Sequence, residues 1–168
     1  MDELRNHYIA WLRDAHAMEE QALTMMKGML SRLEHYPDLS ARIEQHIAET
    51  QEQAAVLRGL LDSRAAGTSM VMDAMGKMAA TGQALSGMFA EDEVVKGGMA
   101  SYTFEHMEII AYKVLIATAR QLGDADAVSL FEKSMVEEQN MADWLFDHMD
   151  ETTRAFLARD AADLPAGR

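Results

Sequence analysis

The scarcity of helix-breaking residues is the strongest constraint on how this chain folds. Its 168 residues include two prolines, at positions 37 and 165, and ten glycines. Proline and glycine mark most turns, so a chain with so few of them favours long helices over the many short strands of an all-β fold. Hydrophobic residues make up 49% of the chain, enough for the core of one domain. The sequence therefore predicts an all-α fold.

Apolar residues recur at helical spacing in four segments, over residues 4–33, 38–63, 99–122 and 124–149. The first two segments are separated by Tyr36 and Pro37, and the last two by Gly123 and Asp124. Glycine commonly ends a helix, and aspartate commonly caps the start of the next one. Each pair of segments therefore predicts a helical hairpin.

The segment between the two hairpins, residues 64–95, contains glycines at positions 67, 76, 82 and 87. We interpret it as a long crossover with a short helix near residues 70–81. Two hairpins joined by one long crossover predict a ferritin-like four-helix bundle over residues 1–150. Residues 151–168 are expected to form a further short helix or a tail.

Charge and composition exclude several classes of function. The formal net charge of -13 would repel a phosphate backbone, so no nucleic-acid partner is expected. The chain shows neither a signal peptide nor an apolar run long enough for a bilayer, which favours a cytoplasmic protein with no membrane partner. It has no cysteine, so any metal must be bound by oxygen or nitrogen. Motifs for serine nucleophiles, phosphate loops and HExxH zinc sites are also missing from the sequence.

Several acidic residues lie on the same helix faces as the regularly spaced apolar residues. These faces are expected to be buried, so the acidic side chains should not reach solvent. Glu19 lies seven residues after Leu12, and Glu138 lies seven residues before Leu145. Residues seven apart share one helix face, so both carboxylates should point inward. The same test selects five inward carboxylates in all, at Glu19, Glu49, Glu105, Glu108 and Glu138.

The spacing of these residues adds an independent constraint. Glu19 and Glu49 are 30 residues apart, and so are Glu108 and Glu138. In an antiparallel hairpin, residues equidistant from the turn lie at the same height, and both midpoints fall at or beside the predicted turns. The sequence therefore predicts that carboxylates from all four helices meet at one level of the bundle.

Ionised carboxylates crowded in an apolar core are strongly disfavoured unless they are paired or bind a cation. We find no Lys or Arg partner on the inward faces. Two divalent ions, iron or manganese, would relieve the repulsion. The alternative is a network of hydrogen bonds with some carboxylates protonated. His46 fits either a ligand or an outer hydrogen-bond donor, whereas His16 fits a core histidine.

Four motifs resemble those of the YciE/YciF-type ferritin-like stress proteins of bacteria. They are Leu12-Arg-Asp-Ala-His-Ala-Met-Glu-Glu-Gln21, His46-Ile-Ala-Glu-Thr-Gln-Glu-Gln53, Glu105-His-Met-Glu-Ile-Ile-Ala-Tyr112 and Glu137-Glu138. The resemblance spans residues 5–148. It implies a rubrerythrin-like bundle, a di-metal site, a homodimer and expression under stress. The chain differs from ferritins and di-iron oxygen enzymes in having no Glu-x-x-His, so its ligand set should be richer in carboxylates.

These observations predict a di-metal protein of the bacterial stress response, with iron or manganese held by Glu19, His46, Glu49, Glu105, Glu108 and Glu138. A reaction with oxygen or peroxide is the expected chemistry, and no catalytic residue is assigned. The alternative is a non-catalytic helical protein that serves structure and partner binding.

Overall fold

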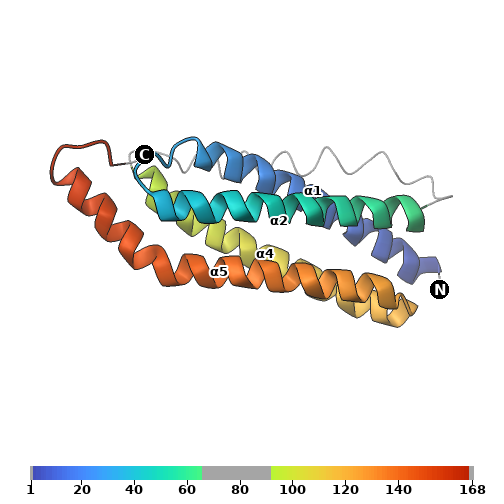
Figure 1. Ribbon diagram of the computed structural model, residues 1–168. Helices are drawn as coiled ribbons and strands as arrows, with labels where there is room; N and C mark the ends of the chain where they lie inside the picture. Colours follow the sequence, from blue (N-terminus) through green and yellow to red (C-terminus); the bar gives the residue numbers. More distant parts are fainter. Residues whose placement is uncertain (1, 66–91, 167–168) are drawn as a thin grey trace.

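The computed structural model describes residues 2–65 and 92–166, and this part of the chain is entirely helical apart from turns and the final residues. Its helices are α1 (Asp2–Leu30), α2 (Pro37–Arg64), α4 (Glu93–Leu122) and α5 (Ala125–Asp160). Figure 1 shows the hairpin of α1 and α2 stacked on the hairpin of α4 and α5. The predicted all-α four-helix bundle is confirmed.

Two turns form as the sequence predicts. Pro37 occupies the start of α2, where a missing backbone N–H costs nothing. Gly123 ends α4 with a φ of 73°, a left-handed conformation that suits glycine. Asp124 then caps α5, because its carboxylate accepts a hydrogen bond from the backbone N–H of Ala127.

The helix boundaries differ from the prediction in three places. α1 ends at Leu30 rather than near residue 33, and residues 31–36 form the turn. α4 begins at Glu93 rather than near residue 99, and includes Gly97 and Gly98. A β-carbon at Gly98 would lie 2.5 Å from Cε of Met149, so the glycine permits close packing of α4 and α5. The expected helix end near residue 149 is also wrong, because α5 continues to Asp160 with no proline or glycine to stop it. The short helix expected at residues 70–81 lies outside the described residues.

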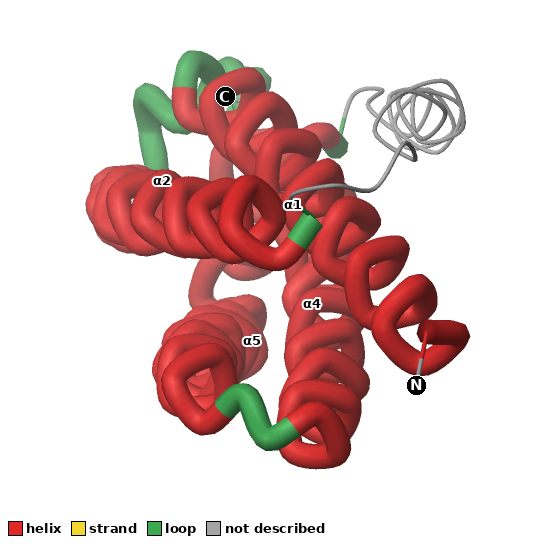
Figure 2. The backbone as a smooth tube through the Cα atoms, turned by 90° about the vertical axis from the view of Figure 1, so that its right-hand side faces the viewer, coloured by secondary structure: helices red, strands yellow, loops and turns green. Residues whose placement is uncertain are grey.

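Figure 2 looks along the bundle and shows α2 and α5 on one side, with α1 and α4 on the other. Apolar residues form two separate clusters along its length. One cluster contains Leu12, Leu57 and Phe131, and the other contains Met26, Ile43 and Leu145. The inward acidic residues lie between these clusters in the sequence of every helix. Among the described helices, none combines the length and apolarity that a bilayer span requires.

Candidate metal centre

A layer of buried polar side chains divides the two apolar clusters, and every helix contributes to it. The buried members are Glu19 of α1, His46 of α2, Glu105 and Glu108 of α4, and Glu138 of α5, none more than 3% exposed. Glu49 of α2 lies at the edge, with its side chain 22% exposed. The inward orientation predicted for Glu19, Glu105, Glu108 and Glu138 is therefore observed, whereas Glu49, which was also predicted to point inward, lies at the edge of the layer.

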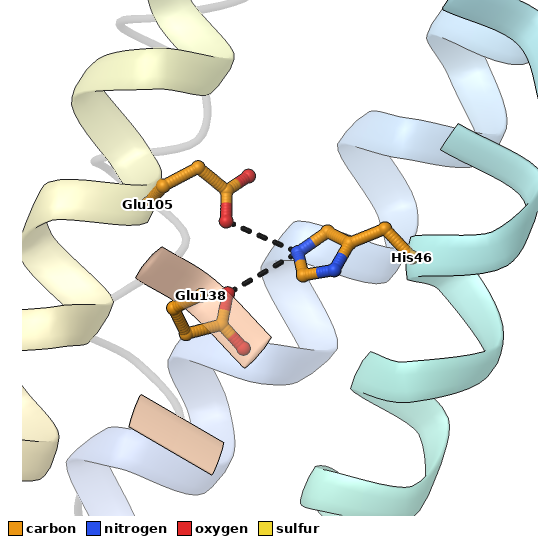
Figure 3. Close-up of side chains that lie close together, drawn as sticks. All are labelled: His46, Glu105 and Glu138. Atoms are coloured by element: carbon orange, nitrogen blue, oxygen red, sulfur yellow. Dashed lines mark hydrogen bonds and ion pairs between the residues drawn. The ribbon is translucent and has the colours of Figure 1, made fainter. Parts of the chain in front are cut away.

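His46, Glu105 and Glu138 form the centre of this layer (Figure 3). Nε2 of His46 lies 3.0 Å from Oε2 of Glu105 and 3.2 Å from Oε2 of Glu138. These donor atoms all lie within 4.8 Å of one another. One ring nitrogen carries at most one proton and cannot satisfy two carboxylates. Both oxygens of Glu138 consequently lack a hydrogen-bond partner within the described structure.

Glu49 contacts the opposite side of the same imidazole. Its Oε2 lies 2.8 Å from Nδ1 of His46 and 3.2 Å from Nη1 of Arg42, and its Oε1 accepts a hydrogen bond from Gln45. The expectation that these faces lack a basic partner is wrong for Glu49. Arg42 precedes it by seven residues, and this spacing was a signal for the pair.

Glu19 and Glu108 are two further buried carboxylates of the layer. The hydroxyl of Tyr112 donates a 2.5 Å hydrogen bond to Oε1 of Glu19. Oε2 of Glu19 and Oε1 of Glu108 are buried and have no hydrogen-bond partner among residues 2–65 and 92–166. Both carboxylates interact electrostatically with Glu138. The sequence did not predict Tyr112 as a hydrogen-bond donor to this layer.

Burial controls the protonation of the layer. Burial, followed by repulsion from Glu138, raises the pKa of Glu19 to about 8. Burial raises the pKa of Glu105 to about 7 and that of Glu108 well above its usual range. Burial alone would lower the pKa of His46, but its hydrogen bond to Glu105 and its close contact with the Glu138 carboxylate outweigh that effect and raise it to about 11. The layer therefore retains protons that a bound cation would displace.

The donor set fits a divalent cation. Imidazole and carboxylate ligands suit iron and manganese, and the oxygens without partners are free to coordinate. The structure brings together His46, Glu105 and Glu138, and places Glu19 and Glu108 beside them. It places Glu49 behind the imidazole, where it holds the ring from its other nitrogen. His16 is half-buried and outside the cluster.

A second polar contact was not predicted. Gln53 of α2 is 2% exposed and donates a 3.0 Å hydrogen bond from Nε2 to Oε2 of Glu137 on α5. Its Oε1 is buried without a hydrogen-bond partner in the described part of the chain. The side chain of Glu137 is only 20% exposed. The spacing of Gln53, seven residues after His46, was the signal for its inward orientation.

Comparison with known proteins adds the family. Residues 3–158 match a family described as a domain of unknown function, DUF892. A protein of Xanthomonas campestris pv. campestris with a solved crystal structure is 39% identical, covers 94% of this chain and 99% of its own, and superposes with a TM-score of 0.78. The E. coli stress protein YciF is 22% identical and covers 89% of this chain and 96% of its own, with a TM-score of 0.72. The second similarity shows a shared fold.

Proposed function

This chain belongs to the DUF892 family, and we propose that it binds two divalent metal ions, iron or manganese, within its layer of buried carboxylates. One observation carries the proposal. Glu138 is fully buried, and neither of its oxygens has a hydrogen-bond partner in the described structure, although His46 and Glu105 lie against it. Burying a carboxylate whose oxygens accept no hydrogen bond is costly, and a coordinated cation offsets that cost.

The layer offers two unequal positions. Nε2 of His46 with carboxylate oxygens of Glu105 and Glu138 would form the first. Free oxygens of Glu19 and Glu108, with the second oxygen of Glu138, would form the other. This arrangement makes Glu138 the residue shared by both ions. Glu49 would act on the first position by fixing the imidazole from Nδ1.

We further propose that this ferritin-like site serves a bacterial stress response, because the structurally similar YciF of E. coli is a stress protein. Bound iron or manganese would supply the redox chemistry for a reaction with oxygen or peroxide. The protein's own contribution is to keep the site dry and its ligands oriented. Tyr112 holds one oxygen of Glu19, which leaves only the other oxygen of that carboxylate free.

The competing function is a non-catalytic helical protein whose core is a hydrogen-bonded network. The contacts of His46 with Glu105 and Glu49, and of Tyr112 with Glu19, favour this alternative. So do the raised pKa values of Glu19 and Glu105, about 8 and about 7, since both carboxyls then retain protons near neutral pH.

Metal content and stoichiometry separate the two functions. We expect protein purified without added metal to contain iron or manganese by elemental analysis, and the stripped protein to bind two equivalents in a calorimetric titration. The substitution Glu138→Gln preserves the shape of the side chain but removes the negative charge that both metal positions would share. This variant should bind at least one equivalent of metal less than the wild-type protein. Glu132→Gln is the matched control on the same helix, because Glu132 is exposed and pairs with Arg120. No metal in the wild-type protein by either measurement would favour the non-catalytic function.

We also propose that the protein forms a homodimer through the outer face of α4. Its exposed apolar residues are Met99, Met107, Ile110 and Val114, between 39% and 57% exposed. The structure describes all of α4, and no carboxylate on it is exposed. The charged side chains exposed on α4 include the basic Lys113 and Arg120, so in a chain with a net charge of -13 two copies can approach along this face without repulsion between carboxylates.

Light scattering after gel filtration tests the homodimer. We expect the wild-type protein to have twice the monomer mass, and Ile110→Glu to shift it to the monomer. Val136→Glu on α5 alters an equally exposed apolar residue outside this face and should leave the dimer intact. A monomeric wild-type protein would contradict the homodimer proposal.

A further inference from the structure

The carboxylate layer lies too deep for a hydrated ion to reach it across packed apolar side chains. Glu138 is 0% exposed, and Glu108 and His46 are each 1% exposed. A divalent cation loses much of its hydration on entering an apolar medium and needs polar groups to replace the lost water. An ion that reaches this layer through the folded bundle must therefore follow polar side chains.

Polar residues run from the surface to the layer along the seam between α2 and α5, which together form one side of the bundle (Figure 2). Exposure falls in steps, from 73% for the side chain of Glu52 to 20% for Glu137. It then falls to 2% for Gln53 and to 0% for Glu138, the residue after Glu137. Carboxylate and amide groups of decreasing exposure thus lie along the seam, and Gln53 and Glu137 are joined by a hydrogen bond.

Gln53 is the group on this seam that points to a ligand. Its amide nitrogen, Nε2, donates a hydrogen bond to Glu137, and its amide oxygen, Oε1, therefore points away from Glu137. That oxygen is buried and lacks a hydrogen-bond partner within the described residues. A neutral amide oxygen coordinates a hard cation more weakly than a carboxylate does, so it suits transfer rather than retention.

Lys133 stands at the outer end of the seam. Its Nζ lies 3.4 Å from Oε2 of Glu52 on α2 and 3.4 Å from Oε1 of Glu137 on α5. Lys133 therefore forms ion pairs with the two carboxylates that an arriving cation would contact first. It is 61% exposed, so it can leave without disturbing the core.

The other partly exposed part of the layer, at Glu49, is less suited to a cation. Both of its oxygens already accept hydrogen bonds, from Arg42, Gln45 and His46. The guanidinium of Arg42 is only 9% exposed and repels a cation at this point.

We propose that the seam formed by Glu52, Lys133, Glu137 and Gln53 is the path by which divalent cations reach the buried carboxylates. This inference rests on the proposed metal function. A cation displaces Lys133, exchanges water for oxygens of Glu137, passes Oε1 of Gln53 and arrives at Glu138. Lys133 limits the rate of uptake, and Glu137 and Gln53 increase it.

Uptake and release rates test the path without any assay of catalysis. Stripped full-length protein is mixed with Co²⁺ in a stopped-flow spectrometer, and release from loaded protein is followed with an excess of chelator. We expect Glu137→Gln to slow uptake at least about fivefold, and Lys133→Met to accelerate it by a similar factor at low salt. Gln53→Leu, of similar volume, should also slow uptake, and Glu132→Gln is the control on the same helix.

A substitution on an entry path changes the rates of uptake and release by the same factor. The dissociation constant is the ratio of these two rates, so its calorimetric value should change less than about twofold. If Glu137→Gln and Lys133→Met both take up Co²⁺ at the wild-type rate and bind it with wild-type affinity, the proposed path is wrong. The proposed metal function would be unaffected by that result. A proportional loss of affinity in Glu137→Gln would make Glu137 a ligand and also overturn it. Faster uptake in Arg42→Ala alone would place the path at Glu49. Failure of the wild-type protein to bind Co²⁺, Fe²⁺ or Mn²⁺ at equilibrium would refute the metal function itself.

Discussion

The metal-free protein is expected to lose stability as the pH rises from about 5 to about 8. The native pKa values of Glu19 and Glu105 are about 8 and about 7, against a usual value of 4.5. The native state therefore binds more protons than the unfolded state within this range, and the free energy of unfolding falls with pH. His46, with its pKa raised from 6.5 to about 11, has an effect of the same sign above about pH 6.5. The pKa of Glu49 is lowered, and its effect is confined to pH values below its usual range.

The size of the effect follows from Glu19 alone. One pKa unit corresponds to about 1.4 kcal/mol, so raising the pH from about 4.5 to about 7 costs the native state about 3 kcal/mol at this residue. Glu105 shares the neighbours of Glu19, and the two costs are not independent. We therefore assign about 3 kcal/mol to the whole layer, a large share of the stability of a typical domain.

Urea unfolding of stripped and dialysed protein at several pH values measures this directly. Glu19→Gln removes the titrating group and should flatten the profile by about 1 kcal/mol per pH unit. Glu20→Gln is the matched control, because the neighbouring side chain is exposed. Saturating metal should reverse the slope, since coordination requires deprotonated ligands. Constant or rising stability of the stripped wild-type protein between pH 5 and 8, or an unchanged slope in Glu19→Gln, would refute the reasoning.

Three further predictions concern other parts of the molecule. Glu138→Ala should remove at least one metal equivalent, whereas Glu49→Ala should retain both and lower affinity about tenfold to a hundredfold; calorimetric stoichiometry distinguishes the two results. Asp124→Ala should cost about 2 kcal/mol in urea unfolding, because Asp124 caps α5 and forms a two-point ion pair with Arg64; a loss below about 0.5 kcal/mol would show that neither contact matters. Ferrous-loaded protein should be oxidised by peroxide faster than free ferrous ion in stopped-flow spectra, and equal rates would indicate metal binding without this chemistry.

The sequence was sufficient for the helices because their signals are local. Apolar periodicity, Pro37, Gly123 and Asp124 act within a few residues, and the structure places all three where the sequence predicts. The early start of α4 was missed because Gly97 and Gly98 weaken a helix in isolation. Gly98 leaves room for the side chain of Met149 on another helix. The local sequence does not show that this contact between helices exists.

The buried carboxylates of the layer followed from the sequence, but which of His46 and Glu49 faces its centre did not. Equal spacing places Glu49 at the height of the other carboxylates, and His46 precedes it by three residues. Three residues turn a helix by about 300°, so the two side chains point about 60° apart. Which of them faces the axis depends on how α2 is rotated against α5, a property of the packed bundle. In the structure His46 faces Glu138, and Glu49 contacts the outer nitrogen.

The position of the layer is itself an argument for function. Apolar clusters lie on both sides of it, and hydrophobic residues at these positions would join them into one continuous core. Replacing buried charges with apolar groups of similar volume is often neutral or stabilising, so folding alone gives no reason for carboxylates here. A purely structural network would be expected to satisfy its own hydrogen bonds, yet the described structure leaves oxygens of Glu19, Glu108 and Glu138 without partners. Those oxygens belong to three helices, and the Glu138 carboxylate interacts electrostatically with both Glu19 and Glu108, so a cation bound among them would offset repulsion that the protein alone leaves in place.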